Sequence, residues 1–268
     1  MKLLHKNVLI TGASGGIGRA LAIELARRGA CVFLAGRDEV GLRLLLSSLN
    51  NPSRHRVLLF RDYSDSEIAM LAEELSGSQR LDILINNAGV NKFSLLESQS
   101  VEEIREQIRV NVELPILITR QLLGRFNSNG MVVNVGSVMG DIGYPGYSVY
   151  CASKFALRGF SEALGRELHG HGIKVLYTAP RSTRTSINSQ AATAMNRALG
   201  NSTDTPEVVA LGIVRAIEKE HLRSHFGWPE RLFIKINALF PWLVDNAISR
   251  KVAMIRRYAR LSVTGEAK

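Results

Sequence analysis

The chain has 268 residues, 46% of them hydrophobic, which is enough to bury the core of one α/β domain. Its net charge of +10 favours an anionic partner, but no basic and aromatic residues interleave in a binding motif, so we expect no nucleic acid. Two cysteines, Cys31 and Cys151, are too few for a disulfide framework and favour a reducing cytoplasm, and the first expected strand begins too early to leave room for a cleavable signal.

Short β-branched runs alternate with helical patterns along most of the chain. Strands are expected at Asn7–Thr11, Cys31–Ala35, Arg56–Phe60, Leu81–Ile85, Met131–Val135 and Lys174–Thr178. Helices are expected at Ile17–Arg28, Glu39–Leu49, Ser66–Leu75, Val101–Phe126, Ser148–His169 and Pro206–Glu218. Alternation of helices with continuously apolar strands is typical of a parallel sheet covered on both faces. We therefore predict a single doubly wound α/β domain that binds ligands at the carboxyl ends of its strands.

A glycine-rich turn joins the first expected strand to the first expected helix. It reads Thr11-Gly12-Ala13-Ser14-Gly15-Gly16-Ile17-Gly18. Glycines let the backbone approach a pyrophosphate, and the free amides at the helix start can bind it. The turn therefore predicts a nucleotide site formed by Gly12, Ser14, Gly15, Gly16, Ile17 and Gly18.

Tyr150 and Lys154 lie four residues apart in an expected helix, so their side chains share one face. A nearby cation favours the phenolate, so we expect the pKa of Tyr150 to fall below its ordinary value of about 10. Such a phenol can exchange a proton beside a hydride carrier, as carbonyl reduction or alcohol oxidation requires. Ser137 ends the fifth expected strand at the same edge of the sheet and can hydrogen-bond a substrate oxygen.

The order and spacing of these motifs resemble those of the classical short-chain dehydrogenases/reductases. The resemblance covers about residues 7–185 and continues through Asn86-Asn87-Ala88-Gly89 and Asn111. It implies a Rossmann fold and a catalytic set consisting of Asn111, Ser137, Tyr150 and Lys154. In that family the tyrosine transfers the proton, the serine holds the substrate oxygen, and the lysine bonds the nicotinamide ribose. The asparagine anchors a water that completes a proton relay.

The end of the second expected strand indicates which nicotinamide cofactor binds. An acidic residue there would bind the ribose hydroxyls of NAD, but Gly36 takes that place and Arg37 follows. A guanidinium can bind a 2′-phosphate, and by resemblance this pattern implies NADP(H). Arg19, just inside the first expected helix, is expected to add a second positive charge. The resemblance also implies cofactor contacts by Asp62, at the adenine ring, and by Asn87, Ala88, Gly89, Tyr150 and Lys154.

The segment after the sixth expected strand departs from the family pattern. Arg181 replaces the usual glycine after Pro180, which leaves the path of this loop past the nicotinamide open. Pro180, Thr183 and Thr185 are expected to contact the cofactor. Residues 186–204, rich in Ala, Ser and Asn without a strong period, predict a mobile lid over the substrate, with a disordered connector as the alternative.

Residues 1–228 are predicted to form the catalytic domain, and residues 229–268 an apolar and basic helical extension of it. Eight Lys or Arg and two Asp or Glu give residues 231–268 a net charge of +6. Polar residues interrupt the apolar stretch, so no bilayer-spanning helix is expected. Three interpretations remain open: the extension packs on this domain or a neighbouring subunit, lines a pocket for a long hydrophobic substrate, or lies on a membrane surface.

Together these patterns predict an NADP(H)-dependent oxidoreductase that interconverts a carbonyl and an alcohol. The expected substrate is a hydrophobic ketone, aldehyde or 3-oxoacyl-type compound. We expect no metal ion in the site. Tyr144 and Tyr147 compete with Tyr150 for the acid role, but neither has a lysine one turn later, so we expect them to line the substrate cavity. The alternatives are a non-catalytic nucleotide sensor and a membrane-surface scaffold. By resemblance we expect a cytoplasmic homodimer or homotetramer.

Overall fold

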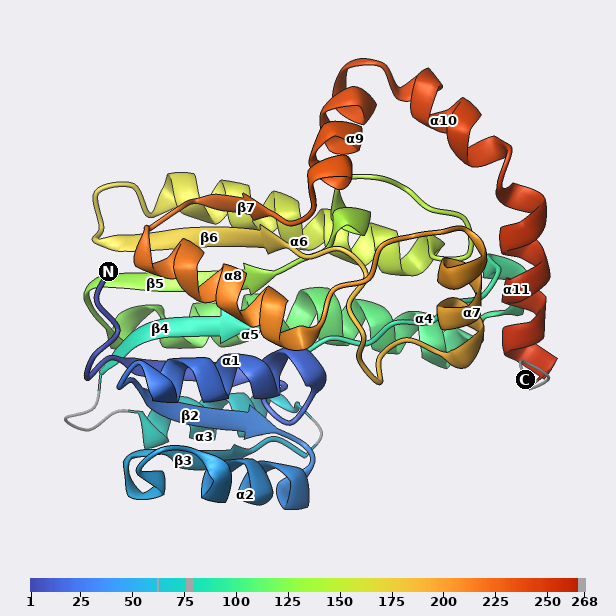
Figure 1. The fold of residues 1–268 in the computed structure, drawn as a ribbon. Coiled ribbons are helices and arrows are strands. Elements are labelled where there is room, and N and C mark those ends of the chain that lie inside the picture. The colour runs from blue at the N-terminus through green and yellow to red at the C-terminus, as the bar shows by residue number, and fades with distance from the viewer. Residues whose placement is uncertain (62, 76–79, 265–268) are drawn as a thin grey trace.

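The computed structural model describes residues 1–61, 63–75 and 80–264 (Figure 1). Within these ranges the strands are β1 (Asn7–Thr11), β2 (Cys31–Gly36), β3 (Arg56–Leu59), β4 (Leu81–Asn86), β5 (Phe126–Val135), β6 (Ile173–Ala179) and β7 (Arg223–His225). They form one sheet in the order β3-β2-β1-β4-β5-β6-β7, and every neighbouring pair is parallel. The predicted doubly wound parallel sheet is confirmed.

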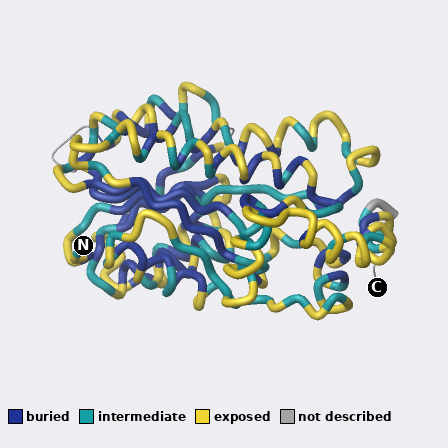
Figure 2. Tube along the Cα trace, turned by 90° about the horizontal axis from the view of Figure 1, so that it is seen from above, coloured by how far each residue is buried: buried dark blue, intermediate teal, exposed yellow. Residues whose placement is uncertain are grey.

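Helices cover both faces of the sheet, so its strands form the buried centre of the molecule (Figure 2). One face packs against α1 (Gly16–Arg27), α2 (Glu39–Ser48) and α8 (Pro206–Glu218). The other packs against α3 (Asp65–Glu74), α5 (Leu114–Leu122) and α6 (Ser148–Glu167). Because successive side chains of a strand point to opposite faces, Val8 and Ile10 join the first core and Leu9 joins the second.

The order in which successive strands are added to the sheet changes direction between β1 and β4. β2 and β3 lie on one side of β1, whereas β4 and the later strands lie on the other. The hydroxyl of Thr11, at the end of β1, accepts hydrogen bonds from the amides of Asn87 and Ala88, both at 3.0 Å. The turns after β1 and β4 are thereby held side by side at the switch point, where ligands bind in open α/β sheets.

The expected helix Val101–Phe126 is interrupted twice. α4 (Val101–Ile108) passes into a π-helical turn, Arg109–Glu113, before α5 begins, and a short 3-10 turn follows α5. Phe126 starts β5 instead of ending the helix, because its side chain is buried and it pairs with Leu81 of β4. The prediction for this residue was wrong, and β5 begins five residues earlier than expected.

One described strand and one described α-helix were not predicted. The three-residue edge strand β7 is too short to carry a pattern. α7 (Gln190–Ala198) lies inside the segment expected to be a lid. Its buried alanines and Met195 pack against Ile255 and Ala259, in the core that this helix shares with the C-terminal residues. Because most of its buried residues are alanines, the helix shows only a weak periodic pattern of hydrophobic residues in the sequence, which explains why it was not predicted.

The predicted C-terminal helical extension is confirmed. It consists of α9 (Trp228–Leu239), α10 (Pro241–Ser249) and α11 (Val252–Thr264), which together we call the C-terminal arch (residues 228–264). Figure 1 shows the arch rising from the sheet edge after β7 and descending beside α7. No helix in the described parts of the chain has the length and hydropathy to cross a bilayer. Cys31 and Cys151 are both free thiols.

Candidate active site

The glycine turn after β1 is too tightly packed for side chains at two positions. Gly12 has a φ of +62°, and a Cβ atom there would lie 2.8 Å from Cα of Ala88. A Cβ atom at Gly18, in the first turn of α1, would lie 2.2 Å from the carbonyl oxygen of Gly12. The side-chain amide of Asn87 donates to the carbonyls of Thr11 and Gly12, at 3.0 and 3.1 Å. These contacts fix the turn in one shape.

The start of α1 fits a pyrophosphate. Gly15 precedes the helix, and among the described residues no side chain caps it. Its first amides and the positive end of its dipole are therefore free to bind an anion. Ser14 lies in the same turn, and Ile17 lines the adjoining cavity. The Thr185 side chain packs directly against Gly16. The residues predicted to hold a dinucleotide therefore form a suitable cradle.

Replacing Gly12 with Ala is expected to weaken NADPH binding about tenfold or more, because the left-handed backbone conformation and the Ala88 contact both oppose a methyl group. Gly159→Ala on α6 is the matched control, since a Cβ atom there meets nothing within 4 Å. NADPH fluorescence titration together with thermal unfolding checks both variants. Equal affinity in the two folded variants would contradict the assigned turn.

Asn111 lies on the π-helical turn between α4 and α5 and is 1% exposed. Its amide nitrogen donates to the Val90 carbonyl at 2.9 Å and to the Ser153 hydroxyl at 3.0 Å. Its oxygen accepts from the Val90 amide at 2.9 Å. A Cβ atom at Gly89 would lie 3.3 Å from the Asn111 oxygen and 3.7 Å from the Lys154 nitrogen. Asn111 thus anchors the loop after β4 next to Lys154, and π-helical turns of this kind are frequent at functional sites.

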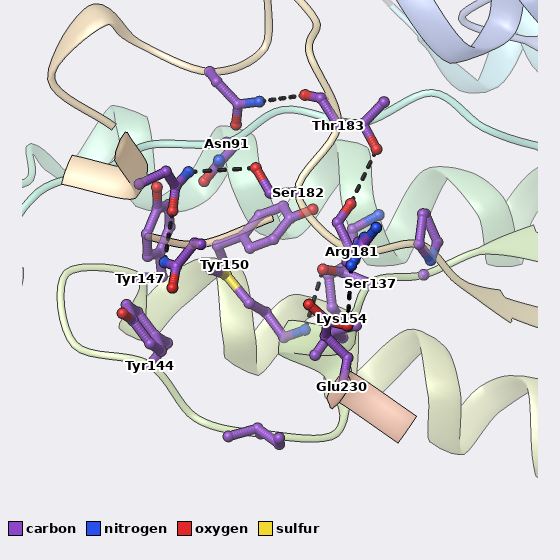
Figure 3. A pocket seen from close by; sticks show the side chains of 18 of the residues that line it. Asn91, Ser137, Tyr144, Tyr147, Tyr150, Lys154, Arg181, Ser182, Thr183 and Glu230 are labelled. Carbon is purple, nitrogen blue, oxygen red and sulfur yellow. Dashed lines mark hydrogen bonds and ion pairs between the residues drawn. The ribbon is translucent and has the colours of Figure 1, made fainter. Parts of the chain in front are cut away.

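Ser137, Tyr150 and Lys154 come together at the carboxyl edge of β5 and the start of α6 (Figure 3). Ser137 hydrogen-bonds Tyr150. The Ser137 hydroxyl oxygen also accepts from the Met139 amide at 3.1 Å. Lys154 is buried and donates to the Val135 carbonyl at 3.0 Å, with its nitrogen 5.7 Å from the centre of the Tyr150 ring. The three side chains predicted for catalysis therefore share one site.

The expectation of an unusually acidic Tyr150 is wrong in this structure. Burial raises the pKa of Tyr150 to about 12, and the hydrogen bond with Ser137 offsets only part of that rise. Burial also lowers the pKa of Lys154 to about 8. The ammonium is bonded to a backbone carbonyl and not to the phenol, so it does not outweigh the desolvation of Tyr150. The phenol keeps its proton at neutral pH.

A cavity of about 460 Å³ opens beside these residues. Its nucleotide side includes Ile17, Asn87 and Gly89. Its lining also includes an apolar and aromatic group, which we call the apolar wall: Met139, Ile142, Tyr144, Tyr147, Phe233, Val244 and Ile248. The last three belong to α9 and α10, so the C-terminal arch supplies part of this wall. Tyr144 and Tyr147 line the cavity as predicted.

Tyr147 is unsuited to the acid role for which it competed in the sequence. It is 2% exposed, and its ring stacks on Phe93 with 4.9 Å between ring centres. Burial raises the pKa of Tyr147 beyond the usual range of a phenol. Burial also raises the pKa of Tyr144. Neither has a lysine in the position that Lys154 occupies relative to Tyr150.

Arg181, which replaces a family glycine, ties three segments together. Its guanidinium makes two hydrogen bonds to Asp204, at 2.7 and 2.9 Å, and lies 3.4 Å from a carboxylate oxygen of Glu230 on α9. These partners hold the pKa of Arg181 above its ordinary value, mainly through the hydrogen bonds to Asp204. The residue therefore links the loop after β6 to the end of the expected lid and to the arch. Sequence reasoning identified the substitution but missed its partners.

The loop after β6 also carries three predicted cofactor contacts. Pro180, Thr183 and Thr185 line the cavity. The Thr183 hydroxyl donates to the Arg181 carbonyl at 2.9 Å, and its own carbonyl accepts from the Asn188 side chain at 2.7 Å. Asn91 is a further lining residue that the sequence did not suggest. Its buried oxygen has no hydrogen-bond partner among the described residues, so it can accept a bond from a ligand.

Arg37 follows β2 at the edge where the 2′-phosphate was expected. Its guanidinium is exposed, lies 5.3 Å from the centre of the Tyr63 ring and approaches Glu106 at 3.8 Å. Exposed ion pairs are weak, so this arginine can bind an anionic ligand instead. Arg19 is exposed in the first turn of α1. Asp62, predicted to meet the adenine ring, lies outside the described residues.

Comparison with known proteins agrees with this geometry. The sequence profile described as "short chain dehydrogenase" matches residues 6–196. An uncharacterized oxidoreductase of Bacillus subtilis, YusZ, is 30% identical over 92% of this chain and 98% of its own. The 3-oxoacyl-[acyl-carrier-protein] reductase FabG of Haemophilus influenzae is 33% identical over 65% of this chain and 73% of its own.

Solved structures show the same fold. A short-chain dehydrogenase from Sphingobium yanoikuyae in complex with NADPH has a TM-score of 0.75 and 28% identity, covering 90% of this chain and 96% of that one. A short chain dehydrogenase/reductase from Burkholderia phymatum in complex with NAD has a TM-score of 0.81 and 21% identity. The match covers 91% of this chain and 96% of that one. The chain therefore belongs to the classical short-chain dehydrogenase/reductase family of oxidoreductases.

Proposed function

We propose that this oxidoreductase uses NADPH to reduce the carbonyl group of a hydrophobic ketone, aldehyde or 3-oxoacyl-type compound. One observation carries the proposal: a single cavity joins Ser137, Tyr150 and Lys154 to an apolar wall. Apolar pockets with a few convergent polar groups are typical of small-molecule sites. The similarity to a 3-oxoacyl-[acyl-carrier-protein] reductase supports the acyl-type substrate among these three.

The protonation states of the site suit reduction at neutral pH. Bound NADPH would supply the hydride. Tyr150, whose pKa is raised to about 12 by burial, holds a proton that it can donate to the carbonyl oxygen. The Ser137 hydroxyl accepts from the Met139 amide and hydrogen-bonds Tyr150, so it lies beside the phenol, where it can turn its hydrogen to the same carbonyl oxygen when substrate binds. Lys154, with its pKa lowered by burial to about 8, stays mostly charged and stabilises the phenolate that remains.

The preference for NADPH over NADH is proposed from the end of β2. Gly36 offers no carboxylate to the ribose hydroxyls, and the exposed Arg37 provides a guanidinium for a 2′-phosphate. Relatives of this fold occur in complex with either nucleotide, so the proposal depends on these two residues of this chain. Assembly as a homodimer or homotetramer and a cytoplasmic location stay predictions.

A turnover screen tests the proposed function. Ketones, aldehydes and acyl thioesters of graded chain length are mixed with NADPH or NADH, and absorbance of the reduced nucleotide is followed. We expect kcat/KM to rise with chain length by about tenfold for every two methylenes that enter the apolar cavity, since each buried methylene contributes about 0.8 kcal/mol. Turnover that falls with chain length, or that favours small charged carbonyl compounds, would contradict the proposed substrate class.

A further inference from the structure

The outer surface of the C-terminal arch is unusually apolar. Apart from Phe233, which lines the cavity, its exposed large hydrophobic residues are Trp228, Leu232, Leu239, Phe240, Trp242, Leu243 and Met254. Trp228 is 74% exposed and Leu239 is 69% exposed. Residues four and eleven positions apart lie on one face of a helix, so Trp228, Leu232 and Leu239 form a stripe along α9. An exposed apolar surface of this kind marks an interaction site.

The inner side of the arch already has partners, so the apolar stripe is not a misplaced core face. The Asn237 side chain on α9 donates to the Asp141 carbonyl at 3.0 Å, and Glu230 pairs with Arg181. On α11, Ile255 and Ala259 are fully buried against the core that includes α7. The helices are therefore fixed through one side while the other side, with its aromatic residues, faces solvent.

The charge of the arch identifies the partner by its chemistry. Residues 228–264 contain seven Lys or Arg and two Asp or Glu, a net charge of +5. One of the two acidic residues, Glu230, is engaged by Arg181. Lys235 falls between Leu232 and Leu239 on α9, and Arg256, Arg257 and Arg260 are exposed on α11. Like charges oppose the docking of two copies through this face, whereas an anionic surface is attracted to it.

We propose that the C-terminal arch docks on the surface of an anionic lipid bilayer. Tryptophan, phenylalanine and leucine side chains enter the boundary between headgroups and acyl chains, and the arginines and lysines pair with lipid phosphates. α9 and α10 carry both this outer surface and the cavity-lining residues Phe233, Val244 and Ile248. If the proposed reductase function holds, the two helices that touch the bilayer also form part of the cavity wall, so docking holds the cavity close to membrane-dissolved carbonyl compounds.

Vesicle flotation of the full chain tests the docking surface, with no substrate or turnover involved. Vesicles contain phosphatidylcholine alone or phosphatidylcholine with phosphatidylserine. The arch variant carries Trp228→Ser, Leu232→Ser and Leu239→Ser, none of which lines the cavity. Its matched control carries Val40→Ser, Leu44→Ser and Met70→Ser, three similarly exposed positions on α2 and α3. Thermal unfolding and NADPH titration confirm that both variants are folded.

We expect the wild type and the control to float with the phosphatidylserine vesicles at low salt and to be released at high salt. The arch variant is expected to lose about tenfold or more in vesicle affinity, and so is a variant with Arg256→Gln, Arg257→Gln and Arg260→Gln. The inactive Tyr150→Phe enzyme should float like the wild type, which separates docking from catalysis.

Two results would overturn the proposal. The first is that the wild-type protein does not bind anionic vesicles, or that the arch variant binds them as tightly as the wild-type protein does. The second is a molecular mass, measured by light scattering, that falls in the arch variant but not in its control. That second result would identify the face as a contact between copies of this chain instead.

Discussion

Replacing Tyr150 with Phe is expected to lower kcat for carbonyl reduction by about 10²–10⁴-fold, because it removes the proton that the substrate oxygen receives. The phenyl ring keeps the shape of the side chain in its place beside Ser137 and Lys154. NADPH affinity is therefore expected to stay within about twofold. Single-turnover absorbance changes and fluorescence titration measure the two quantities separately.

Tyr147→Phe provides the matched comparison for this experiment. Tyr147 lines the same cavity but is buried against Phe93, so removing its hydroxyl should leave kcat within about tenfold of the wild type. Equal losses in the two variants would assign the defect to the shape of the cavity. Undiminished turnover by Tyr150→Phe would remove the proposed acid and favour the rival Tyr144 or Tyr147.

Replacing Arg37 with Asp is expected to lower kcat/KM for NADPH by about 10–100-fold, since hydrogen bonds to charged groups contribute about 1.5–3 kcal/mol. The new carboxylate also repels a 2′-phosphate and can accept hydrogen bonds from ribose hydroxyls. The value for NADH should therefore rise or stay constant, and the ratio of the two values measures the change.

Arg43→Asp is the control for charge. Arg43 lies on α2, is exposed and pairs with Glu39, so the same change in net charge occurs away from the end of β2. We expect it to leave the NADPH to NADH ratio within about twofold. A wild-type enzyme that prefers NADH, or an Arg37→Asp variant with an unchanged ratio, would show that the end of β2 does not select the cofactor.

Most of the sheet was predictable because its strands are short continuous apolar runs. β1 has the predicted limits, and β2 extends one residue past its predicted end. The glycine turn was predictable from its position directly between a strand and a helix, and Gly18 is required there by a local contact with the Gly12 carbonyl. The contact of Gly12 with Ala88 comes from a distant segment and could not be read from the sequence. Local pattern also predicted that Tyr150 and Lys154 share a helix face.

What the sequence could not show depends on contacts between distant residues. Arg181 is paired with Asp204 and Glu230, which are 23 and 49 positions away along the chain. α7 is helical where alanines give little period, and it packs against α11. The pKa of Tyr150 was predicted in the wrong direction because burial, which raises it, is a tertiary property. The π-helical turn around Asn111 likewise left no recognisable pattern.

The central claim is that Tyr150 and Ser137 hold a carbonyl oxygen while a hydride reaches the carbonyl carbon. Its most direct test uses NADPH carrying deuterium at both positions of nicotinamide C4 with the best substrate of the chain-length screen, followed by mass spectrometry of the product. We predict an alcohol with one deuterium on the former carbonyl carbon, formed by the wild type and about 10²–10⁴-fold more slowly by Tyr150→Phe. NADPH that binds tightly yet transfers no deuterium to any of the carbonyl compounds would contradict it.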